Sequence, residues 1–301
     1  MLTIFSVPKP FLGHTAIIQH NAIKSWTLLY PTCEIILCGD DPGVKEAAAE
    51  FKAKQIPDIC RNEYGTPLLN SVFDKVPKIA SHRLMCYVNA DIILLSDFIR
   101  AVERIRFPRF LMVGRRWNIR IAEQWDFDQL GWEERLRNYI AEHGIIDTPD
   151  AIDYMAFSHD DALTKLPLFA VGRPGWDNWF IQHARKLSIP VIDATRVVKA
   201  IHQAHDYSHV PQRKGEKWEG PEADRNRDLM GGGELPFTIL DATHVMTSKA
   251  IEPAFYYNYL RFSWRPSQLL QLLVRGKRSL IAFKKAALRI VRSLASLVRP
   301  R

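Results

Sequence analysis

The alternation of short apolar runs with helical patterns in the first half of the chain constrains its fold most. Leu2–Val7 and Glu34–Gly39 are apolar runs of strand length, and each is followed by a helical pattern, over Thr15–Leu29 and Val44–Lys54. Near-continuous apolar strands that alternate with helices are typical of a parallel sheet with helices on both faces. The sequence therefore predicts an α/β fold, and such sheets bind ligands beyond the carboxyl ends of their strands.

The rest of the chain extends this pattern less regularly. Further expected elements are a helix near 67–80, a strand run over Leu84–Leu95, strands at Phe110–Val113, Tyr154–Phe157, Val191–Ile201 and Thr238–Val245, and helices over Trp132–His143 and Asp177–Leu187. Residues 203–236 are polar and rich in Gly and Pro, which predicts a long loop. Such a loop could close over a bound ligand, with Gly231–Gly233 as its hinge.

Basic residues are concentrated at the C-terminal end. The chain has a formal net charge of +8, but residues 261–301 hold 11 Lys and Arg and no acidic residue. The preceding 260 residues therefore carry a net charge of −3. A nucleic-acid-binding protein would carry its basic footprint across the folded domain. We therefore do not expect nucleic acid as a partner.

The basic residues of 277–299 fall on one side of a helical projection, opposite Leu, Ile, Val and Phe side chains. An all-basic polar face is typical of an amphipathic helix in an anionic membrane interface. A helix docked on the domain or on a partner, and one that binds nucleic acid, are the alternatives, although a docked helix usually mixes Glu with its Lys. We expect a catalytic-type domain over 1–255 and a membrane-association segment of amphipathic helices over 256–301.

The four cysteines and the N-terminal sequence indicate the compartment. Cys33, Cys38, Cys60 and Cys86 form no CxxC pair, which argues against a zinc site or a disulfide scaffold. No signal peptide and no apolar stretch of membrane-spanning length is recognisable. These features predict a cytoplasmic protein that is peripheral at the inner face of the plasma membrane.

The polar segment Asn89-Ala90-Asp91 interrupts the apolar run Tyr87–Ile92, at the expected edge of the sheet. Burying a carboxylate there is costly unless it is paired or bound to a cation. A plain turn is the alternative, because Asn and Asp are common turn residues.

This segment and three others make the chain similar to nucleotide-sugar-dependent glycosyltransferases of the GT-A fold. More specifically, the chain resembles bacterial family-two-like sequences. The resemblance covers about residues 1–250 and leaves the tail outside. It implies a Rossmann-like, mostly parallel sheet and the transfer of a hexosyl group from a nucleotide-diphosphate donor. Four segments carry it: Phe5–Pro10, Cys38–Asp41, Tyr87–Asp91 and Gly172–Trp179.

The resemblance assigns the donor site. Asp91 matches the last Asp of a DxD motif, which binds a divalent cation, Mn²⁺ or Mg²⁺, that bridges the donor's diphosphate. Asn89 replaces the first acid, whose position contacts sugar or ribose. Asp40 falls where the family often binds the nucleotide base, with a plain turn as the alternative. Pro8 and Ala90, which lie within two of these segments, are further expected donor contacts.

Arg115 follows an expected strand and could clamp a phosphate or an acidic acceptor. A solvated pair of Arg115 with Arg116 is the alternative. The cluster His202–His209 resembles the position of a further metal or diphosphate ligand, with His202 as first choice and His205 as second. Its spacing also permits a metal site made of histidines alone.

Asp177 is similar in placement to the acidic residue that opens a helix beneath the acceptor site. It is the candidate general base of an inverting reaction, and a helix N-cap is its alternative role. Trp176 and Trp179 flank it and are the candidate acceptor-binding aromatics, unless they belong to the core. Asp160 and Asp161 are the rival acids.

These features predict a metal-assisted glycosyltransferase with a UDP- or GDP-linked donor. The acceptor would be the hydroxyl of a lipid-linked or membrane-borne saccharide, as in glycolipid, lipopolysaccharide or exopolysaccharide assembly. A nucleotidyltransferase is disfavoured because no Gly-rich loop follows the first strand. Two rival hypotheses stay open: a His-based metal-dependent hydrolase, and a membrane-recruited binding protein with a degenerate transferase domain.

Overall fold

The computed structural model describes residues 1–204, 219–231 and 237–254. The basic tail, His205 and Gly232-Gly233 lie outside the described residues. The strands are β1 (Thr3–Ser6), β2 (Glu34–Cys38), β3 (Lys54–Ile56), β4 (Leu84–Val88), β5 (Ile92–Ile93), β6 (Leu111–Ile119), β7 (Ile145–Ile146), β8 (Ile152–Ser158), β9 (Val191–Asp193), β10 (Ala200–Gln203), β11 (His244–Met246) and β12 (Ile251–Pro253). The helices are α1 (Gly13–Thr27), α2 (Val44–Glu50), α3 (Leu69–Ile79), α4 (Ser96–Glu103), α5 (Trp132–His143), α6 (Trp176–Lys186), α7 (Pro221–Leu229) and the 3₁₀ helix η1 (Ile239–Asp241).

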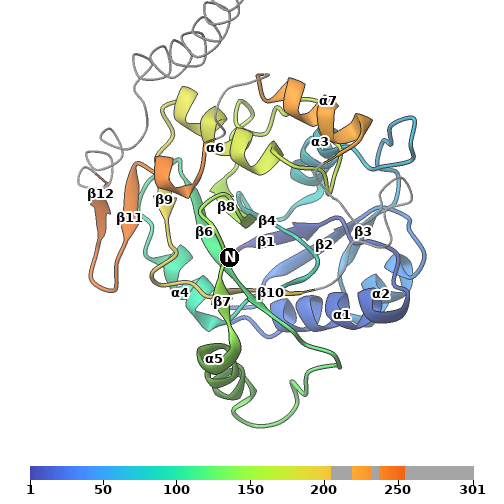
Figure 1. Ribbon diagram of the computed structural model, residues 1–301, viewed down its shortest axis with the longest axis vertical. Coiled ribbons are helices and arrows are strands. Elements are labelled where there is room, and N and C mark those ends of the chain that lie inside the picture. Colours follow the sequence, from blue (N-terminus) through green and yellow to red (C-terminus); the bar gives the residue numbers. More distant parts are fainter. Residues whose placement is uncertain (205–218, 232–236, 255–301) are drawn as a thin grey trace, which may run out of the picture. The chain divides into compact units, whose positions relative to one another are not determined.

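One mixed sheet organises the described chain, in the order β12-β11-β9-β6-β8-β4-β1-β2-β3 (Figure 1). The neighbours from β3 to β4 pair in parallel, as do β6, β9 and β11, and β8 is antiparallel to both β4 and β6. The prediction of a mostly parallel sheet flanked by helices is confirmed. Because β8 runs against β4, its first residues lie at the edge where β4 ends.

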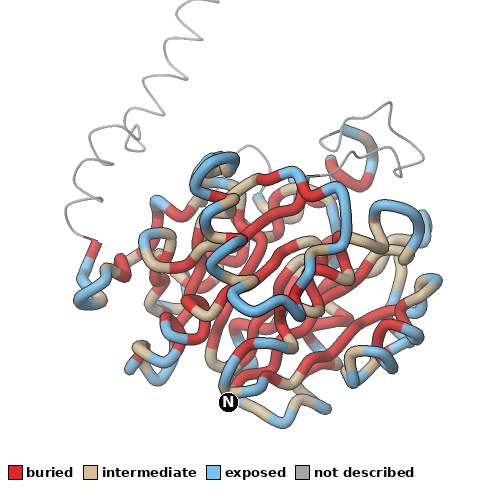
Figure 2. The backbone as a smooth tube through the Cα atoms, turned by 90° about the horizontal axis from the view of Figure 1, so that it is seen from below, coloured by how far each residue is buried: buried red, intermediate tan, exposed pale blue. Residues whose placement is uncertain are grey.

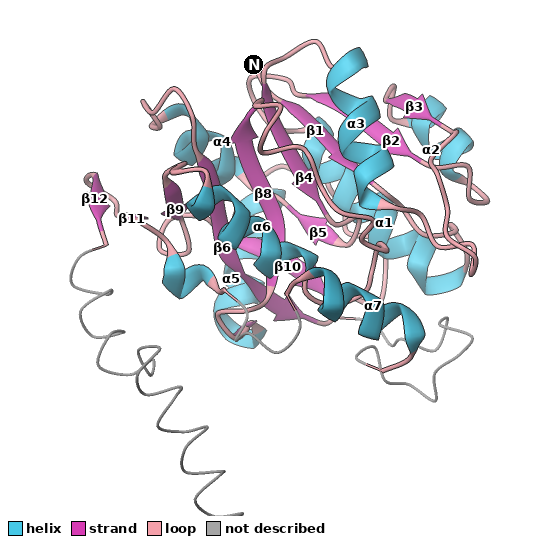
Figure 3. Cartoon of the chain, turned by 90° about the horizontal axis from the view of Figure 1, so that it is seen from above, coloured by secondary structure: helices cyan, strands magenta, loops and turns pink. Residues whose placement is uncertain are grey.

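Helices cover both faces of the sheet (Figure 3). On one face α1, α2 and α4 pack around Trp26 and Phe98, and on the other α3 and α6 pack around Phe73 and Phe180. These four side chains are buried, and Figure 2 shows buried residues along the interior segments and exposed residues along the outer loops. Alternate strand residues supply both cores, which is why the strands read as continuous apolar runs.

Several elements differ from their expected bounds. β6 extends to Ile119, so Arg115 and Arg116 are strand residues and do not follow the strand. The expected strand Val191–Ile201 is divided into β9 and β10, and η1 precedes β11. No helix of the described residues is long and apolar enough to cross a membrane.

Helix α7 lies within the segment 203–236, which the composition predicts as a loop. Pro221 stands in its first turn with Glu222 and Asp224, where proline and acids favour a helix start. The helix lacks an apolar stripe because much of what it buries is polar. Buried Asn226 exchanges hydrogen bonds with the backbone N–H and carbonyl of Ala170.

Candidate active site

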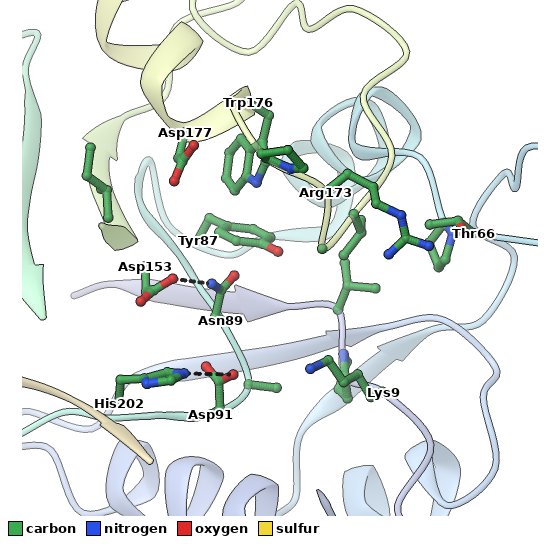
Figure 4. Close-up of a pocket in the computed structure, with 18 of the residues that line it drawn as sticks. Lys9, Thr66, Tyr87, Asn89, Asp91, Asp153, Arg173, Trp176, Asp177 and His202 are labelled. Atoms are coloured by element: carbon green, nitrogen blue, oxygen red, sulfur yellow. Dashed lines mark hydrogen bonds and ion pairs between the residues drawn. The ribbon is translucent and has the colours of Figure 1, made fainter. Parts of the chain in front are cut away.

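A cavity of about 680 Å³ opens where β1 and β4 end, bordered by the start of β8 and by the N-terminus of α6 (Figure 4). Its position matches the rule that α/β sheets bind ligands at the carboxyl ends of their strands. The polar side chains along its walls include Lys9, Gln19, Asp41, Arg61, Thr66, Asn89, Asp91, Arg116, Asp147, Asp150, Asp153, Arg173, Asp177 and His202.

Gln19 of α1 fixes the loop that follows β1. Its Oε1 accepts a hydrogen bond from the Lys9 N–H at 2.7 Å, and its Nε2 donates to the Lys9 carbonyl at 2.9 Å. Gln19 is buried, and both polar atoms of its side-chain amide bond to the backbone of Lys9. Pro8 and Lys9 are thereby held at the cavity wall, where the sequence predicts contacts with the donor.

Asn89 and Asp153 meet across the antiparallel pair β4–β8. The Asn89 N–H donates to the Asp153 carbonyl at 2.9 Å, and Asn89 Nδ2 donates to Asp153 Oδ1 at 2.6 Å. An ionised carboxylate only accepts hydrogen bonds, so the NH₂ group of Asn89 must face Asp153. The side-chain oxygen of Asn89 then points away from Asp153 (Figure 4).

Arg116 holds Asp153 in place from the neighbouring strand. Its Nη1 donates to Asp153 Oδ2 at 2.6 Å, and its Nε donates to Asp147 Oδ2 at 2.8 Å. Burial alone would raise the pKa of Asp147, but hydrogen bonds from Asn118 and the Thr148 N–H, together with Arg116, hold it well below its usual range. Burial would likewise lower the pKa of Arg116, and its two carboxylate partners raise it instead. Asp147 and Arg116 therefore stay charged at neutral pH.

Asp91 and His202 lie next to each other although they come from distant parts of the sequence. β10 pairs with β5 so that His202 lies opposite Ile92, and His202 Nε2 is 3.7 Å from Asp91 Oδ2. Two ligands that are each about 2.1 Å from one cation lie no more than about 4.2 Å apart. The spacing therefore permits one cation to contact both atoms, and a carboxylate with an imidazole suits Mn²⁺.

Within the described residues, no group of three His, Cys, Asp or Glu side chains is placed to hold a metal. Asp91 and His202 would supply two protein ligands. Cations such as Mg²⁺ are commonly held by one or two carboxylates together with substrate phosphates and water. The pair therefore fits a cation that binds together with a phosphorylated substrate.

Asp177 lies across the cavity, in the first turn of α6. The N-cap of this helix is Gly175, at φ 100°, so Asp177 is not the N-cap and instead receives the Asn178 N–H on Oδ1 at 2.9 Å. Its carboxylate points into the cavity beside Trp176, on the same side as Asp153 (Figure 4). The positive end of the helix dipole stabilises an ionised carboxylate there.

The far end of the cavity carries arginines. Arg173 Nε donates to Glu222 Oε2 of α7 at 2.9 Å, and Asn62 Nδ2 donates to Glu222 Oε1 at 2.7 Å. Burial would raise the pKa of Glu222, but hydrogen bonds from Thr66, Asn62 and Arg173 lower it. Helix α7 therefore anchors Arg173 at the cavity wall.

Three of the expected site residues lie outside the cavity lining. Asp40 is exposed and pairs with Arg61 at 2.7 Å, whereas the adjacent Asp41 lines the cavity and meets the same guanidinium at 3.0 Å. Arg115 donates to the Asp147 carbonyl, and Arg116 reaches the cavity instead, because neighbouring strand residues point to opposite faces.

Trp179 is the third expected site residue outside the cavity lining, because it lies one turn further along α6 than Trp176. It packs on Phe169, with ring centroids 5.4 Å apart, and stacks on His183 at 4.5 Å. Trp176 lines the cavity and also packs edge-on against Tyr87 at 4.9 Å. The rival acid Asp160 accepts the Ala162 and Leu163 N–H groups in a turn and pairs with Arg109.

The expected residues that the structure brings together at the cavity are Pro8, Asn89, Ala90, Asp91, Trp176, Asp177 and His202. Asp147 and Asp153 line the cavity but were not predicted as site residues. Asp153 had a recognisable signal, because it interrupts the apolar run Ile152–Phe157 as Asn89 and Asp91 interrupt theirs. Asp147 had none, since it stands in a polar stretch between two short strands.

No protein-family model and no curated protein matches the sequence. Among solved structures, the chain is similar to glucosyl-3-phosphoglycerate synthase from Mycobacterium tuberculosis in complex with Mn²⁺, UDP and phosphoglyceric acid, with 13% identity, 78% of this chain and 80% of that chain covered, and a TM-score of 0.44. It is also similar to a mannosyltransferase from Pyrobaculum calidifontis in complex with GDP-Man and Mn²⁺, with 14% identity, coverage of 72% and 59%, and a TM-score of 0.42. A third similar structure is CMP:2-keto-3-deoxy-manno-octonic acid synthetase with CTP, with 12% identity, coverage of 68% and 88%, and a TM-score of 0.38.

Proposed function

We propose that this chain is a divalent-cation-assisted glycosyltransferase that moves a sugar, of the hexosyl type, from a UDP- or GDP-linked donor to an acceptor hydroxyl. The observation that carries the proposal is the convergence of Asn89, Asp91 and His202 at one end of the cavity with Asp177 across it. This set offers cation ligands for a diphosphate and a separate carboxylate for the acceptor.

The cation would be Mn²⁺ or Mg²⁺, held by Asp91 Oδ2 and His202 Nε2. When bound, it would offset the negative charge that develops on the leaving diphosphate. Asn89 turns its side-chain oxygen away from Asp153, where it can accept a hydrogen bond from a donor hydroxyl. The loop Pro8–Pro10, fixed by Gln19, supplies a wall for the nucleotide part of the donor.

Asp177 would accept the proton of the acceptor hydroxyl in a reaction that inverts the anomeric centre. Its place in the first turn of α6 is supported by packing, because Trp176 beside it is buried against Tyr87. Trp176 offers an apolar surface next to the acid, which suits a sugar ring.

A thermal-shift screen of the full chain against UDP- and GDP-linked sugars, with Mn²⁺ and with EDTA, tests the proposal. We expect one donor class to raise the melting temperature in the presence of Mn²⁺, because a ligand that binds only the folded state stabilises it. Stabilisation without release of sugar would instead favour a binding protein with a degenerate transferase domain. If no nucleotide-sugar stabilises the chain, the proposal is wrong.

We further propose that the acceptor is lipid-linked or membrane-borne and that the chain works at the inner face of the plasma membrane. The support is the sequence of 261–301, with 11 basic and no acidic residues. Co-sedimentation with phosphatidylglycerol-containing vesicles should be lost when residues 266–301 are removed and when salt is raised. Equal binding by the truncated chain would contradict this part of the proposal.

A further inference from the structure

Beside the proposed cation site, a chain of hydrogen bonds runs from Asp147 through Asn118 to His202. Asn118 Nδ2 donates to Asp147 Oδ2 at 2.8 Å, and Asn118 Oδ1 lies 2.9 Å from His202 Nδ1. The backbone places these groups side by side, since β6 pairs in parallel with β10 so that Asn118 lies opposite His202. The Asp147 N–H also donates to the Arg116 carbonyl at 3.0 Å.

The chemistry of each group fixes the direction of this chain. A carboxylate only accepts hydrogen bonds, so Asn118 must turn its NH₂ group to Asp147. Its carbonyl oxygen then faces His202, and because that oxygen also only accepts, His202 Nδ1 must carry a proton. In the neutral imidazole the other nitrogen, Nε2, then has the lone pair.

The orientation of the His202 ring places the Nε2 lone pair on the side of Asp91. His202 Nε2 lies 3.7 Å from Asp91 Oδ2, and both side chains face the cavity (Figure 4). Only 7% of the His202 side chain is exposed, so the ring has little freedom to turn over. A histidine that binds a metal commonly donates its other N–H to a carboxylate, a carbonyl or water, which fixes both tautomer and orientation.

We propose that Asn118 and Asp147 are positioning residues that set His202 with its proton on Nδ1 and its Nε2 lone pair toward the cation site. This inference rests on the cation site of the proposed function. Asp147 acts through Asn118, and neither residue needs to touch the cation. Arg116 Nε donates to the same oxygen, Asp147 Oδ2, and helps to keep that carboxylate in place.

The substitution Asp147→Asn tests the direction of the chain. An amide at 147 accepts hydrogen bonds more weakly than a carboxylate and can also donate, so it no longer fixes which way Asn118 faces. Asn118 can then turn over and present its NH₂ group to His202 Nδ1. That nitrogen would then have to accept, which moves the proton to Nε2 and removes the lone pair that faces Asp91. We expect the affinity for Mn²⁺ to fall about 10–100-fold, the usual effect of losing a partner of a metal-binding histidine.

The exchanged pair Asn118→Asp with Asp147→Asn separates this role from a purely structural one. The new carboxylate at position 118 would accept from His202 Nδ1 and from the amide at 147, and the total charge would be unchanged. We expect this double variant to recover most of the Mn²⁺ affinity. Asp74→Asn is the charge-matched control, because it removes one carboxylate at an exposed residue outside the cavity, and we expect a change of about twofold at most.

The measurements are Mn²⁺ binding in the presence of UDP or GDP, by EPR of free Mn²⁺, and pulsed EPR of Mn²⁺- and nucleotide-loaded protein that carries ¹⁵N-histidine. The wild type should show a histidine nitrogen bound to Mn²⁺, and the signal should vanish in His202→Gln and in Asp147→Asn and return in the exchanged pair. Wild-type affinity with nitrogen coupling retained in Asp147→Asn would overturn the inference but leave the proposed function standing. No Mn²⁺ binding by the wild type in the presence of either UDP or GDP would overturn the cation site itself.

If Asp147→Asn does not fold, the comparison moves to position 118. Asn118→Leu offers His202 Nδ1 no acceptor, whereas Asn118→Gln keeps an amide that can donate to Asp147 and accept from His202. We expect the leucine variant to lose the nitrogen coupling and the glutamine variant to keep it. The same coupling in both variants would overturn the inference.

Discussion

His202 Nε2 lies 3.7 Å from Asp91 Oδ2, and the pairing of β10 with both β5 and β6 produces this proximity. Asp91 closes the turn after β4, in which the Ile92 N–H donates to the Asn89 carbonyl at 3.1 Å. The Gln203 N–H donates to the Asp91 carbonyl at 3.2 Å, so backbone bonds hold both residues. A carboxylate and an imidazole in this fixed arrangement are the core of the proposed cation site.

Asp177→Asn should slow sugar transfer without weakening the binding of the donor. An amide cannot take the acceptor proton, and loss of a general base costs about 10²–10⁴-fold in rate. The turnover number and the thermal shift given by the donor with Mn²⁺ are the measurements, and the product anomer, by NMR, reports inversion. An unchanged turnover number, or a product that retains the donor's anomeric configuration, would contradict this role for Asp177.

Asn89→Asp should lower stability, although it restores the first acid of a DxD motif. Asn89 Nδ2 lies 2.6 Å from Asp153 Oδ1, so the substitution would place two carboxylates in contact. Like charges at that distance disfavour joint ionisation, and we expect a loss of about 1–3 kcal/mol in the free energy of unfolding at pH 7. Urea denaturation measures it.

The companion variant Asn89→Asp with Asp153→Asn exchanges the two groups and should recover most of that stability. If the single variant is as stable as the wild type, the hydrogen bond between residues 89 and 153 does not orient the Asn89 side chain.

Gly175→Ala should displace the start of α6 and with it Asp177. A Cβ at Gly175 would lie 1.9 Å from Met230 Sδ, and φ of 100° is unfavourable for any residue but glycine. We expect a lower melting temperature and lower turnover. Gly172→Ala is the control, since Gly172 has φ 69° but no atom within 4 Å of a Cβ there. Equal losses in both variants would mean that the contact with Met230 does not matter.

Glu34→Gln should destabilise the fold in a pH-dependent way. Burial would raise the pKa of Glu34, but hydrogen bonds from Lys54, Thr3 and Ser81 lower it to about 2. Because the pKa is lower in the folded state, the stabilisation is present at neutral pH and is lost as the pH falls from about 4.5 toward 2.

We expect Glu34→Gln to cost about 1–2 kcal/mol at pH 7, because the main partner, Lys54, is half-exposed. The difference between the two proteins, measured by urea denaturation, should shrink between pH 5 and pH 3. A difference that does not change with pH would show that the charge of Glu34 is not its source. Glu63→Gln, at an exposed residue paired with Arg225, is the control.

Strands β1, β2 and β4 could be predicted because they are buried on both faces, whereas the partly exposed β3 and the helix α4 were not predicted. Leu84–Leu95 was recognisable as strand sequence for that reason, and so was the break at Asn89-Ala90-Asp91. Helix α7 could not be predicted, because it buries Glu222 and Asn226 through hydrogen bonds and so has no apolar period. Hydrogen-bond partners that lie far apart in the sequence leave no local signal.

The candidate site was predictable only in part for a related reason. Four site residues stand at the boundary of an apolar or helical pattern, where polar residues are noticeable: Asn89, Asp91, Asp177 and His202. The choices between neighbours, Asp40 or Asp41 and Arg115 or Arg116, depend on which way a side chain points. That is decided by strand alternation and by the irregular register of β6 against β8 between Val113 and Arg115, and neither can be read before the pairing is known.

The most direct test of the account is the release of UDP or GDP from nucleotide-sugars by the full chain, measured with Mn²⁺ and with EDTA in the wild type and in Asp91→Asn. We predict Mn²⁺-dependent release by the wild type, no release in EDTA, and a rate at least about 100-fold lower in the folded variant, since Asp91 is the only proposed carboxylate ligand of the cation. The control Asp74→Asn, at an exposed residue paired with Lys78, should match the wild type. Release that is unaffected by EDTA, or equal in wild type and Asp91→Asn, would contradict the account.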